Sequence, residues 1–277
     1  MSLHLISQTN LTKKDDNIWR SKKHKNINFL YSENIPWFKI EKKSWWYKHR
    51  QKIFEVFLKR NSIRGPILDI GAGNGYVAQY LIKKGYDVTA LEPTDYLARN
   101  AKSIGLPCVI NASLDEAKFL DARISNIVLF DVLEHINNPK TFLKLINKKL
   151  SFEGVLICAV PAYNFLWSGD DFEAGHFQRY TLERIQKLLK QCKFCLIDYS
   201  FYFQFLVIPI LLLRSFPWFL GIRKKRSPKS VLRDHSFQNK WLKNTVSKIL
   251  TREIKKIKHG KKIKFGASLI IAAKKEN

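Results

Sequence analysis

The chain has 277 residues, of which 45% are hydrophobic, and its 49 Lys and Arg against 23 Asp and Glu give a formal net charge of +26. This size supports one sizeable core, or one core with an elaboration. The charge points to an anionic partner, nucleic acid or an anionic membrane surface, although a Lys- and Asn-rich proteome would produce it without any function. The N-terminal stretch lacks the apolar core and cleavage pattern of a signal peptide, so we expect a cytoplasmic protein.

Residues 1–60 are expected to form an N-terminal arm and a cap helix. Residues 1 to about 34 are polar and rich in Lys, Asn and Ser, which predicts a mobile or loosely packed arm. From Trp37 to Arg60, apolar residues such as Trp46, Ile53 and Phe57 recur at helical spacing. This pattern predicts one amphipathic helix that leads into the core.

Residues 61–200 alternate between strand-like and helix-like segments and are expected to form the core domain. The expected strands lie at 66–71, 87–93, 107–111, 124–131, 155–161 and 194–201, with one more at 264–275 in the final unit, 263–277. The expected helices lie at 75–85, 94–105, 139–154 and 181–193. Such alternation predicts an α/β fold with a doubly wound, mostly parallel sheet. Ligands of these sheets bind beyond the carboxyl ends of the strands.

Residues 201–262 interrupt this alternation. The apolar stretch from Phe201 to Leu213 has 13 residues before Arg214, whereas a bilayer span takes about 20, so we expect an interfacial or buried hairpin. A basic run, Arg223–Arg226, follows it. A basic amphipathic helix is then predicted, with an apolar face formed by Leu242, Val246, Ile249, Ile254 and Ile257. The segment holds 16 Lys and Arg against 2 Asp and Glu, more than half of the excess charge.

The stretch "ILDIGAGNGY", from Ile67 to Tyr76, places three glycines at every second position after an apolar strand. Such a cluster implies a backbone geometry that side chains would block. A phosphate-binding G-x-G-x-x-G turn would need a glycine where the chain has Tyr76, and no Gly-Lys-Ser/Thr of a P-loop follows. The spacing therefore disfavours a phosphate cradle.

Two carboxylates accompany this turn. Asp69 precedes the glycines and could reach an amino group, or could hydrogen-bond the turn backbone. Glu92 ends the second predicted strand, where an acidic side chain can accept hydrogen bonds from both hydroxyls of a ribose. The arrangement predicts a site for a nucleoside with a cationic tail.

Several motifs in the chain resemble those of class I S-adenosylmethionine-dependent methyltransferases. They are "ILDIGAGNGYVAQYL", "VTALEP", "NASLDE" and "FDVLEHINNPKTFL", in that order. The resemblance extends from about Ser44 to Lys275. This longer pattern is similar to a bacterial branch of the methyltransferase type 11/12 group, which is often thought to act in cell-envelope or polysaccharide pathways. It implies a Rossmann-like, seven-stranded sheet of order 3-2-1-4-5-7-6 with an antiparallel last strand, so that 201–262 is an insertion between the sixth and seventh strands.

The resemblance also implies S-adenosyl-L-methionine as cofactor and a role for each matching position. The methionine part would lie against Asp69, Gly71, Ala72, Gly73, Asn74 and Gly75. The ribose would lie at Glu92 and Pro93, the adenine between Ser113 and Leu114, and the sulfonium above Asp131, Val132 and Leu133. Many relatives carry Asp in place of Ser113. Trp45, Trp46 and Arg50 resemble an element that closes over the cofactor, with Arg50 near its carboxylate, or the two Trp residues pack in the core.

The candidate acceptor-binding residues follow the fifth strand, where a substrate lid belongs. They are Tyr163, Trp167, His176, Arg179 and Tyr180, with Asp170 and Asp171 among them. His176 is the candidate base, because histidine titrates nearest neutral pH, or it holds the loop. Arg179 would clamp an anionic acceptor or pair with Asp170 or Asp171. Relatives often carry Arg at Gln178 and His at Asp170.

Asp131, Glu134 and His135 form a D-x-x-E-H motif whose positions share one helical face. The spacing resembles that of ubiquinone-pathway O-methyltransferases, in which an acidic and histidine set is linked to a divalent cation. The alternatives to a metal site are helix capping, electrostatic stabilisation of the sulfonium, and packing. For its place at the sulfonium, Asp131 is a second catalytic candidate. Cys192 and Cys195 form a lone CxxC without a second ligand pair, so reduced structural thiols are expected.

Together these features predict an S-adenosyl-L-methionine-dependent methyltransferase for a small-molecule, sugar or lipid-linked acceptor, acting by O-methylation. The basic segment would hold it to the inner membrane surface or to a lipid-linked substrate. An RNA or DNA methyltransferase would explain the charge, but the fourth strand ends "FDVLEH" rather than in an Asn-Pro-Pro-Tyr signature. A non-catalytic scaffold with the cofactor fold is opposed by the intact Asp69, glycines and Glu92.

Overall fold

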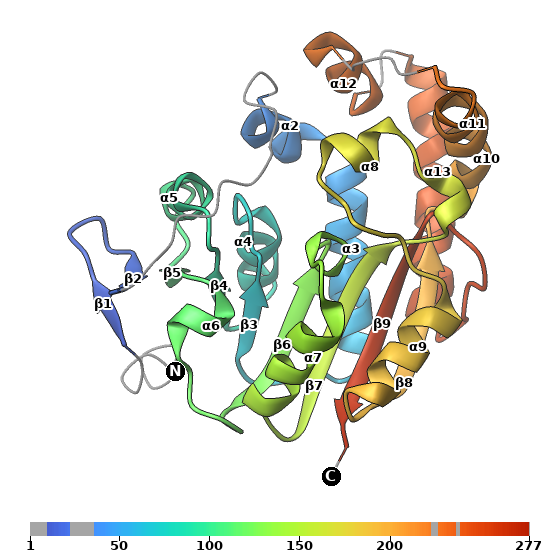
Figure 1. Cartoon of the computed structure of the whole chain (residues 1–277). Helices are drawn as coiled ribbons and strands as arrows, with labels where there is room; N and C mark the ends of the chain where they lie inside the picture. Colours follow the sequence, from blue (N-terminus) through green and yellow to red (C-terminus); the bar gives the residue numbers. More distant parts are fainter. Residues whose placement is uncertain (1–9, 23–35, 223–226, 237–238, 277) are drawn as a thin grey trace.

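The computed structural model describes residues 10–22, 36–222, 227–236 and 239–276. In this part of the chain, one sheet runs in the order β1-β2-β5-β4-β3-β6-β7-β9-β8 (Figure 1). Its strands are β1 (Leu11–Lys13), β2 (Trp19–Ser21), β3 (Ile67–Ile70), β4 (Val88–Leu91), β5 (Val109–Asn111), β6 (Ile124–Phe130), β7 (Leu150–Pro161), β8 (Phe194–Tyr202) and β9 (Ser268–Lys275).

From β5 to β8 this order is the expected 3-2-1-4-5-7-6, and the expected fold class is confirmed. β3 pairs parallel with β4 and β6, and β9 runs antiparallel to both β7 and β8. All four residues of β3 are buried, and so are those of β4, as in strands covered on both faces. Because β3, β4 and β6 are parallel and in register, their carboxyl ends meet at one edge of the sheet.

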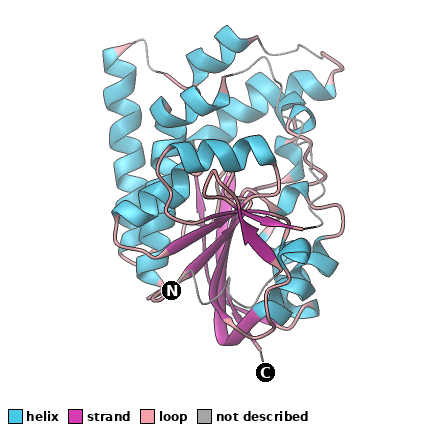
Figure 2. Cartoon of the chain, turned by 90° about the vertical axis from the view of Figure 1, so that its left-hand side faces the viewer, coloured by secondary structure: helices cyan, strands magenta, loops and turns pink. Residues whose placement is uncertain are grey.

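Helices cover both faces of the sheet (Figure 2). In Figure 1, α7 and α9 lie in front of the sheet and α3 behind it, while α2 and α8 lie beyond the carboxyl-end edge. The core helices are α2 (Trp37–Lys43), α3 (Trp45–Arg60), α4 (Tyr76–Lys83), α5 (Asp95–Ser103), α6 (Leu114–Ala117), α7 (Pro139–Lys149), α8 (Gly169–Glu173) and α9 (Leu182–Gln191). Short helical turns are η1 (Leu133–His135) and η2 (Asn164–Leu166).

Residues 10–22 show that the expectation of a loosely packed arm is wrong for this part of the N-terminus. They form the hairpin β1–β2, and β2 adds to the sheet edge in parallel with β5, Trp19 opposite Ile110. Ile18 is 1% exposed and joins the main core. Arg20 donates to Asp95 at the start of α5 over 3.0 Å. A few anchoring contacts thus outweigh the polar composition.

The single helix expected over 37–60 is two helices, because Ser44 starts a new one. Ser44 has an extended backbone, with φ −62° and ψ 132°, between α2 and α3. Its Oγ accepts hydrogen bonds from the backbone N–H groups of Trp46 at 3.1 Å and Tyr47 at 3.4 Å. A serine that satisfies the free amides of a helix start favours a break over continuation.

The segment between β8 and β9 is helical and packs on the core. It contains η3 (Gln204–Leu206), α10 (Val207–Ile210), the π-helical η4 (Leu211–Ser215), α11 (Phe216–Phe219), α12 (Pro228–Asp234) and α13 (Lys240–Lys258). The predicted basic amphipathic helix is α13, and Val246, Leu250 and Ile257 on its buried side join the core beside α3. Leu242, expected on the same face, is 46% exposed.

The basic run Arg223–Arg226 lies outside the described residues. Within the ranges that the structure describes, no helix combines the length and the apolar character needed to cross a membrane.

A buried polar contact fixes α13 to the body of the protein. His49 Nε2 and Glu253 Oε2 lie 2.7 Å apart, and both side chains are almost fully buried. The other oxygen, Glu253 Oε1, accepts a hydrogen bond from the backbone N–H of Gln204 at 3.0 Å. One carboxylate therefore joins α3, α13 and the start of the helical segment.

We predict that Glu253→Ala lowers the free energy of unfolding by about 2 kcal/mol, because it leaves the buried His49 ring without its partner and the backbone N–H of Gln204 without its acceptor. Urea denaturation followed by circular dichroism measures the change. Lys256→Ala, on the exposed side of the same helix, is the matched control and should change stability by less than about 0.5 kcal/mol. Equal effects of the two substitutions would contradict the proposed anchoring role.

Candidate functional site

The glycine turn links β3 to α4 through three residues with positive φ. These angles are +73° at Gly71, +57° at Gly73 and +81° at Gly75. A Cβ atom at Gly71 would lie 2.6 Å from Val132 Cγ2, and one at Gly75 would lie 3.0 Å from the Cα of Ala101. At Gly73 a Cβ would meet no atom of the described chain within 4 Å. The outer two glycines thus permit close packing, and the middle one faces open space.

Two buried carboxyl groups lie beside this turn. Asp69 is 2% exposed, and its Oδ2 has no hydrogen-bond partner among the described residues. Burial and the charge of Glu92 raise the pKa of Asp69 to about 8. Glu92, 4% exposed, accepts hydrogen bonds of 2.8 Å from the backbone N–H groups of Gly73 and Thr94.

These carboxyl groups fit a nucleoside with a cationic tail. A positively charged amino group would give Asp69 its missing partner. A carboxylate has about four acceptor positions, so Glu92 keeps capacity for ribose hydroxyls beside its two backbone donors. The geometry therefore suits the roles that the sequence suggests for both residues, which remain predictions.

Glu41 at the end of α2 is a residue of this region that the sequence did not reveal. Asn74 Nδ2 donates to Glu41 Oε1 over 3.0 Å, and Asn100 Nδ2 donates to Asn74 Oδ1 over 2.9 Å. Burial raises the pKa of Glu41 to about 7. The Asn74 side chain thus ties the turn to α2 and α5. No motif marks Glu41, whose importance depends on how α2 packs.

The residues suggested for adenine take part in local structure. Ser113 caps α6 through a capping box: its Oγ accepts from Glu116 N at 3.2 Å, and its N–H donates to Glu116 Oε2 at 2.9 Å. Leu114 is 2% exposed and lies in the core. Ala72 and Pro93 are half-buried beside the turn. Contact of these residues with a cofactor remains a prediction.

At the end of β6, Asp131 forms an ion pair with Arg50 of α3. The Arg50 guanidinium also lies 5.4 Å from the ring centroids of Tyr47 and Phe54. In this structure, Arg50 therefore neutralises Asp131.

The two residues after Asp131, and the two Trp residues of α3, are held by packing. Val132 packs under Gly71, and Leu133 is fully buried. The ring of Trp46 stacks on that of Phe203, with 4.0 Å between the ring centroids, and the ring of Trp45 lies edge-on to Trp46 at 6.0 Å. The two Trp residues thus pack between α3 and the chain after β8.

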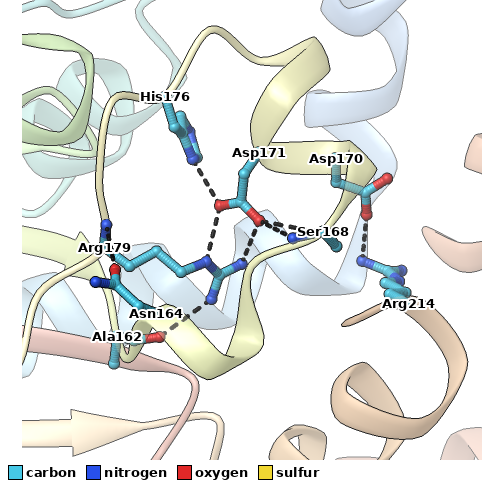
Figure 3. Close-up of polar contacts among 8 residues, drawn as sticks. All are labelled: Ala162, Asn164, Ser168, Asp170, Asp171, His176, Arg179 and Arg214. Carbon is cyan, nitrogen blue, oxygen red and sulfur yellow. Dashed lines mark hydrogen bonds and ion pairs between the residues drawn. The ribbon is translucent and has the colours of Figure 1, made fainter. Parts of the chain in front are cut away.

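The loop after β7 is organised around Asp171, which is 1% exposed (Figure 3). Asp171 Oδ1 accepts from His176 Nδ1 and Arg179 Nε, each at 2.8 Å, and Oδ2 accepts from Arg179 Nη2 at 2.9 Å. Burial would raise the pKa of Asp171, but the hydrogen bond from His176 and the charge of Arg179 outweigh it and lower the pKa. Asp171 is therefore an ionised hydrogen-bond acceptor.

In this network Arg179 pairs with Asp171, as one of its two alternatives expected, and also donates to the carbonyl of Ala162 at 3.1 Å. Contact of Arg179 with an anionic acceptor remains a prediction. Tyr180 is fully buried, and its hydroxyl donates to the Leu133 carbonyl at 3.2 Å. Of the other expected acceptor contacts, Tyr163 stacks on Phe201 at 5.4 Å and Trp167 is half-buried.

Three side chains beside this loop lie close enough to hold a metal ion. Potential ligand atoms of Glu134, His135 and His176 all lie within 4.8 Å of one another. Burial raises the pKa of Glu134 to about 8, and its Oε2 has no hydrogen-bond partner among the described residues. Burial, then the neighbouring His176, lower the pKa of His135 to about 3. Glu134 and His135 lie on the 3₁₀ turn η1, which takes the place of the expected α-helical face.

Comparison with known proteins gives a family match over this region. Residues 46–198, more than half of the chain, match the family model described as "Methyltransferase domain". Among solved structures, the chain resembles an S-adenosylmethionine-dependent methyltransferase from Archaeoglobus fulgidus with a TM-score of 0.54 at 17% identity, covering 87% of this chain and all of the other. It also resembles the plantazolicin methyltransferase BamL, determined with S-adenosylhomocysteine, with a TM-score of 0.52 at 16% identity over 87% and 89% of the two chains.

Two curated relatives match part of the chain. The mitochondrial ubiquinone biosynthesis O-methyltransferase of Schizosaccharomyces pombe is 32% identical over 120 residues, 40% of this chain and 44% of the relative. A Mycobacterium tuberculosis protein described as a probable S-adenosylmethionine-dependent methyltransferase is 27% identical over 134 residues, 46% of each chain. The matches thus span less than half the length of these relatives. The family match, together with the sheet order and the glycine turn, shows that the chain belongs to the methyltransferase domain family, in its class I branch, whose cofactor is S-adenosyl-L-methionine.

Proposed function

We propose that this methyltransferase methylates a hydroxyl group of a small-molecule, sugar or lipid-linked acceptor, with His176 as the base. The observation that carries the proposal is the hydrogen bond between His176 Nδ1 and the ionised Asp171. S-adenosyl-L-methionine, when bound, supplies the methyl group on a sulfonium, which is already a good leaving group. The protein then has to align the acceptor and remove its proton.

The Asp171 network favours His176 for this proton transfer. Because an ionised carboxylate only accepts hydrogen bonds, His176 Nδ1 must carry the proton in their contact. The lone pair of the neutral ring then lies on Nε2, which can take a proton from a hydroxyl, as in other carboxylate–histidine pairs. Arg179, with two hydrogen bonds to Asp171, fixes the carboxylate and balances its charge.

The cofactor side of the proposal assigns the cationic amino group to Asp69 and the ribose hydroxyls to Glu92. The unpartnered Asp69 oxygen and the open space at Gly73 support this assignment. Support for an oxygen acceptor comes from the S. pombe relative, which is named as an O-methyltransferase.

A divalent cation at Glu134, His135 and His176 is a second way to activate the acceptor, favoured by the unpartnered buried oxygen of Glu134. A bound cation would lower the pKa of a coordinated hydroxyl. Full activity after exhaustive chelation would assign proton removal to His176 alone. Activity that is lost on chelation and restored by one divalent metal would assign it to the cation.

For the location, we propose the cytoplasm, peripheral on the inner face of the membrane, where lipid-linked acceptors are present. The net charge of +26, more than half of it in 201–262, supports this assignment.

The proposed activity is tested with methyl-labelled S-adenosyl-L-methionine and an organic-solvent extract of cell lipids and small molecules. We predict label in a product that resists mild alkali, as a methyl ether does and a methyl ester does not. His176→Gln should lower the transfer rate about a hundredfold or more and leave cofactor affinity unchanged in calorimetry. His259→Gln, an exposed histidine at the end of α13, is the matched control. Label in added tRNA instead, or an unchanged rate for His176→Gln, would contradict the proposal.

We predict that Asp69→Asn weakens cofactor binding and stabilises the free protein at alkaline pH. The folded-state pKa, about 8, lies above the ordinary value of 3.8, so the wild type loses stability relative to the variant as the pH rises between these values. The gain should be on the order of 1–3 kcal/mol at pH 8 and smaller at pH 5. Unfolding in urea at both pH values measures it. A variant that is less stable than wild type at pH 8 would contradict the buried, unpaired state of Asp69.

A further inference from the structure

The helices between β8 and α12 expose an unusual amount of apolar surface. Six large apolar side chains between α10 and the end of α11 are 56–75% exposed. They form what we call the apolar face: Ile208, Leu212, Leu213, Phe216, Phe219 and Leu220. Large exposed apolar areas are uncommon on soluble monomers and mark interaction sites.

The opposite side of the same segment is already packed. Val207 and Ile210 of α10 are 4% and 7% exposed and belong to the main core, and Ser215 is fully buried. The segment is thus apolar on both sides, and only one side is covered. A helical segment that is apolar all round needs a second apolar environment.

The charges of α13, in the same segment between β8 and β9, fit an anionic environment. All seven Lys and Arg side chains of α13 are exposed, and none forms an ion pair with an acidic residue in the described part of the chain. The two acidic residues of 201–262 are both engaged, Glu253 with His49 and Asp234 with Arg214. The η3 turn that leads into α10 is joined to α13 through the Gln204–Glu253 hydrogen bond. The apolar face and the unpaired basic side chains therefore belong to one connected helical unit.

We infer that the apolar face inserts into the surface of an anionic phospholipid bilayer, with the basic side chains of α13 held near the lipid headgroups. Aliphatic and aromatic side chains gain free energy at an acyl-chain boundary, and lysines gain it from anionic headgroups. A nucleic acid would match the charges but leave Leu212, Leu213 and Leu220 in water. A second copy of the chain would bring together two strongly basic segments, which repel each other.

The position of the apolar face connects it to the acceptor loop. Arg214, in η4 between the exposed leucines and Phe216, donates to Asp170 Oδ2 over 2.7 Å (Figure 3). Asp170 is next to Asp171, which holds His176. The ring of Trp218 in α11 packs against that of Phe172 in α8, with 5.9 Å between the ring centroids. The acceptor is therefore an amphiphile presented at the bilayer surface, an assignment that rests on the proposed function.

The test is co-sedimentation of the full chain with vesicles, without acceptor. The vesicles are phosphatidylcholine mixed with phosphatidylglycerol, compared with phosphatidylcholine alone. We expect wild-type protein to sediment with the anionic vesicles. The double variant Leu213→Glu/Phe216→Glu should bind them at least about tenfold more weakly. Phe152→Glu, which adds a charge at a 69% exposed phenylalanine on β7, is the matched control and should bind like the wild type.

Calorimetry with S-adenosyl-L-methionine on the same variants separates this inference from the proposed function. Unchanged cofactor binding by Leu213→Glu/Phe216→Glu shows that the variant is folded, so that its loss of vesicle binding reports on the apolar face. The inference is overturned if the wild type does not bind anionic vesicles or the variant binds them as well. It is also overturned if the wild type is a dimer that the double variant converts to monomers. A failure of methyl transfer to any lipid extract, with vesicle binding intact, would count against the proposed function alone.

Discussion

A buried carboxyl group without a partner, Asp69, is the constraint on which the rest of the site depends. It lies at the end of the central strand β3, 2% exposed, and its pKa of about 8 shows how much burial disfavours its charge. A group of this kind costs stability in the free protein. The cost is explained if a cation occupies the position during function, which is what the amino group of S-adenosyl-L-methionine supplies.

The sheet topology brings the other functional groups to the same edge. Parallel pairing of β3 with β4 and β6 sets Glu92 and Asp131 beside the glycine turn. Each of these carboxylates has a different compensation: backbone amides at Glu92, and Arg50 at Asp131. Of these three carboxyl groups, only Asp69 has no such compensation from the described residues, so a positively charged ligand group is the partner that we propose for it.

The acceptor side has the opposite character. Asp171 is fully compensated by His176 and Arg179, so we propose that it orients the base instead of binding a ligand. Arg214 connects the neighbouring Asp170 to the helical segment with the exposed apolar face. The proposed base and the proposed membrane contact are thus connected through Asp170 and Asp171, which are adjacent in the sequence. We therefore expect membrane docking and acceptor delivery to be coupled.

The alternation of strands and helices predicted a doubly wound sheet, and the resemblance to a known family implied its strand order. Local patterns predicted the glycine turn and the carboxylates Asp69 and Glu92, because strand ends and motif spacing fix these positions. Long-range packing decided what the sequence left open. Arg179 could have met an acceptor or Asp171, and only the folded loop shows the Asp171 contact. Glu41, which holds Asn74, has no signal in the sequence. The N-terminal hairpin was not predicted, because the few residues that fix it to the core, such as Ile18 and Arg20, lie in a stretch of mostly polar sequence.

The most direct test of the account is the number of protons exchanged when S-adenosyl-L-methionine binds. Calorimetric titrations near pH 7 in buffers of different ionisation enthalpy measure this number. With a free-protein pKa of about 8, Asp69 is mostly protonated at this pH and must ionise to pair with the amino group, so we expect release of about one proton per cofactor bound. The release should disappear in Asp69→Asn. Binding by the wild type without proton release would contradict the central role given to this buried carboxyl group.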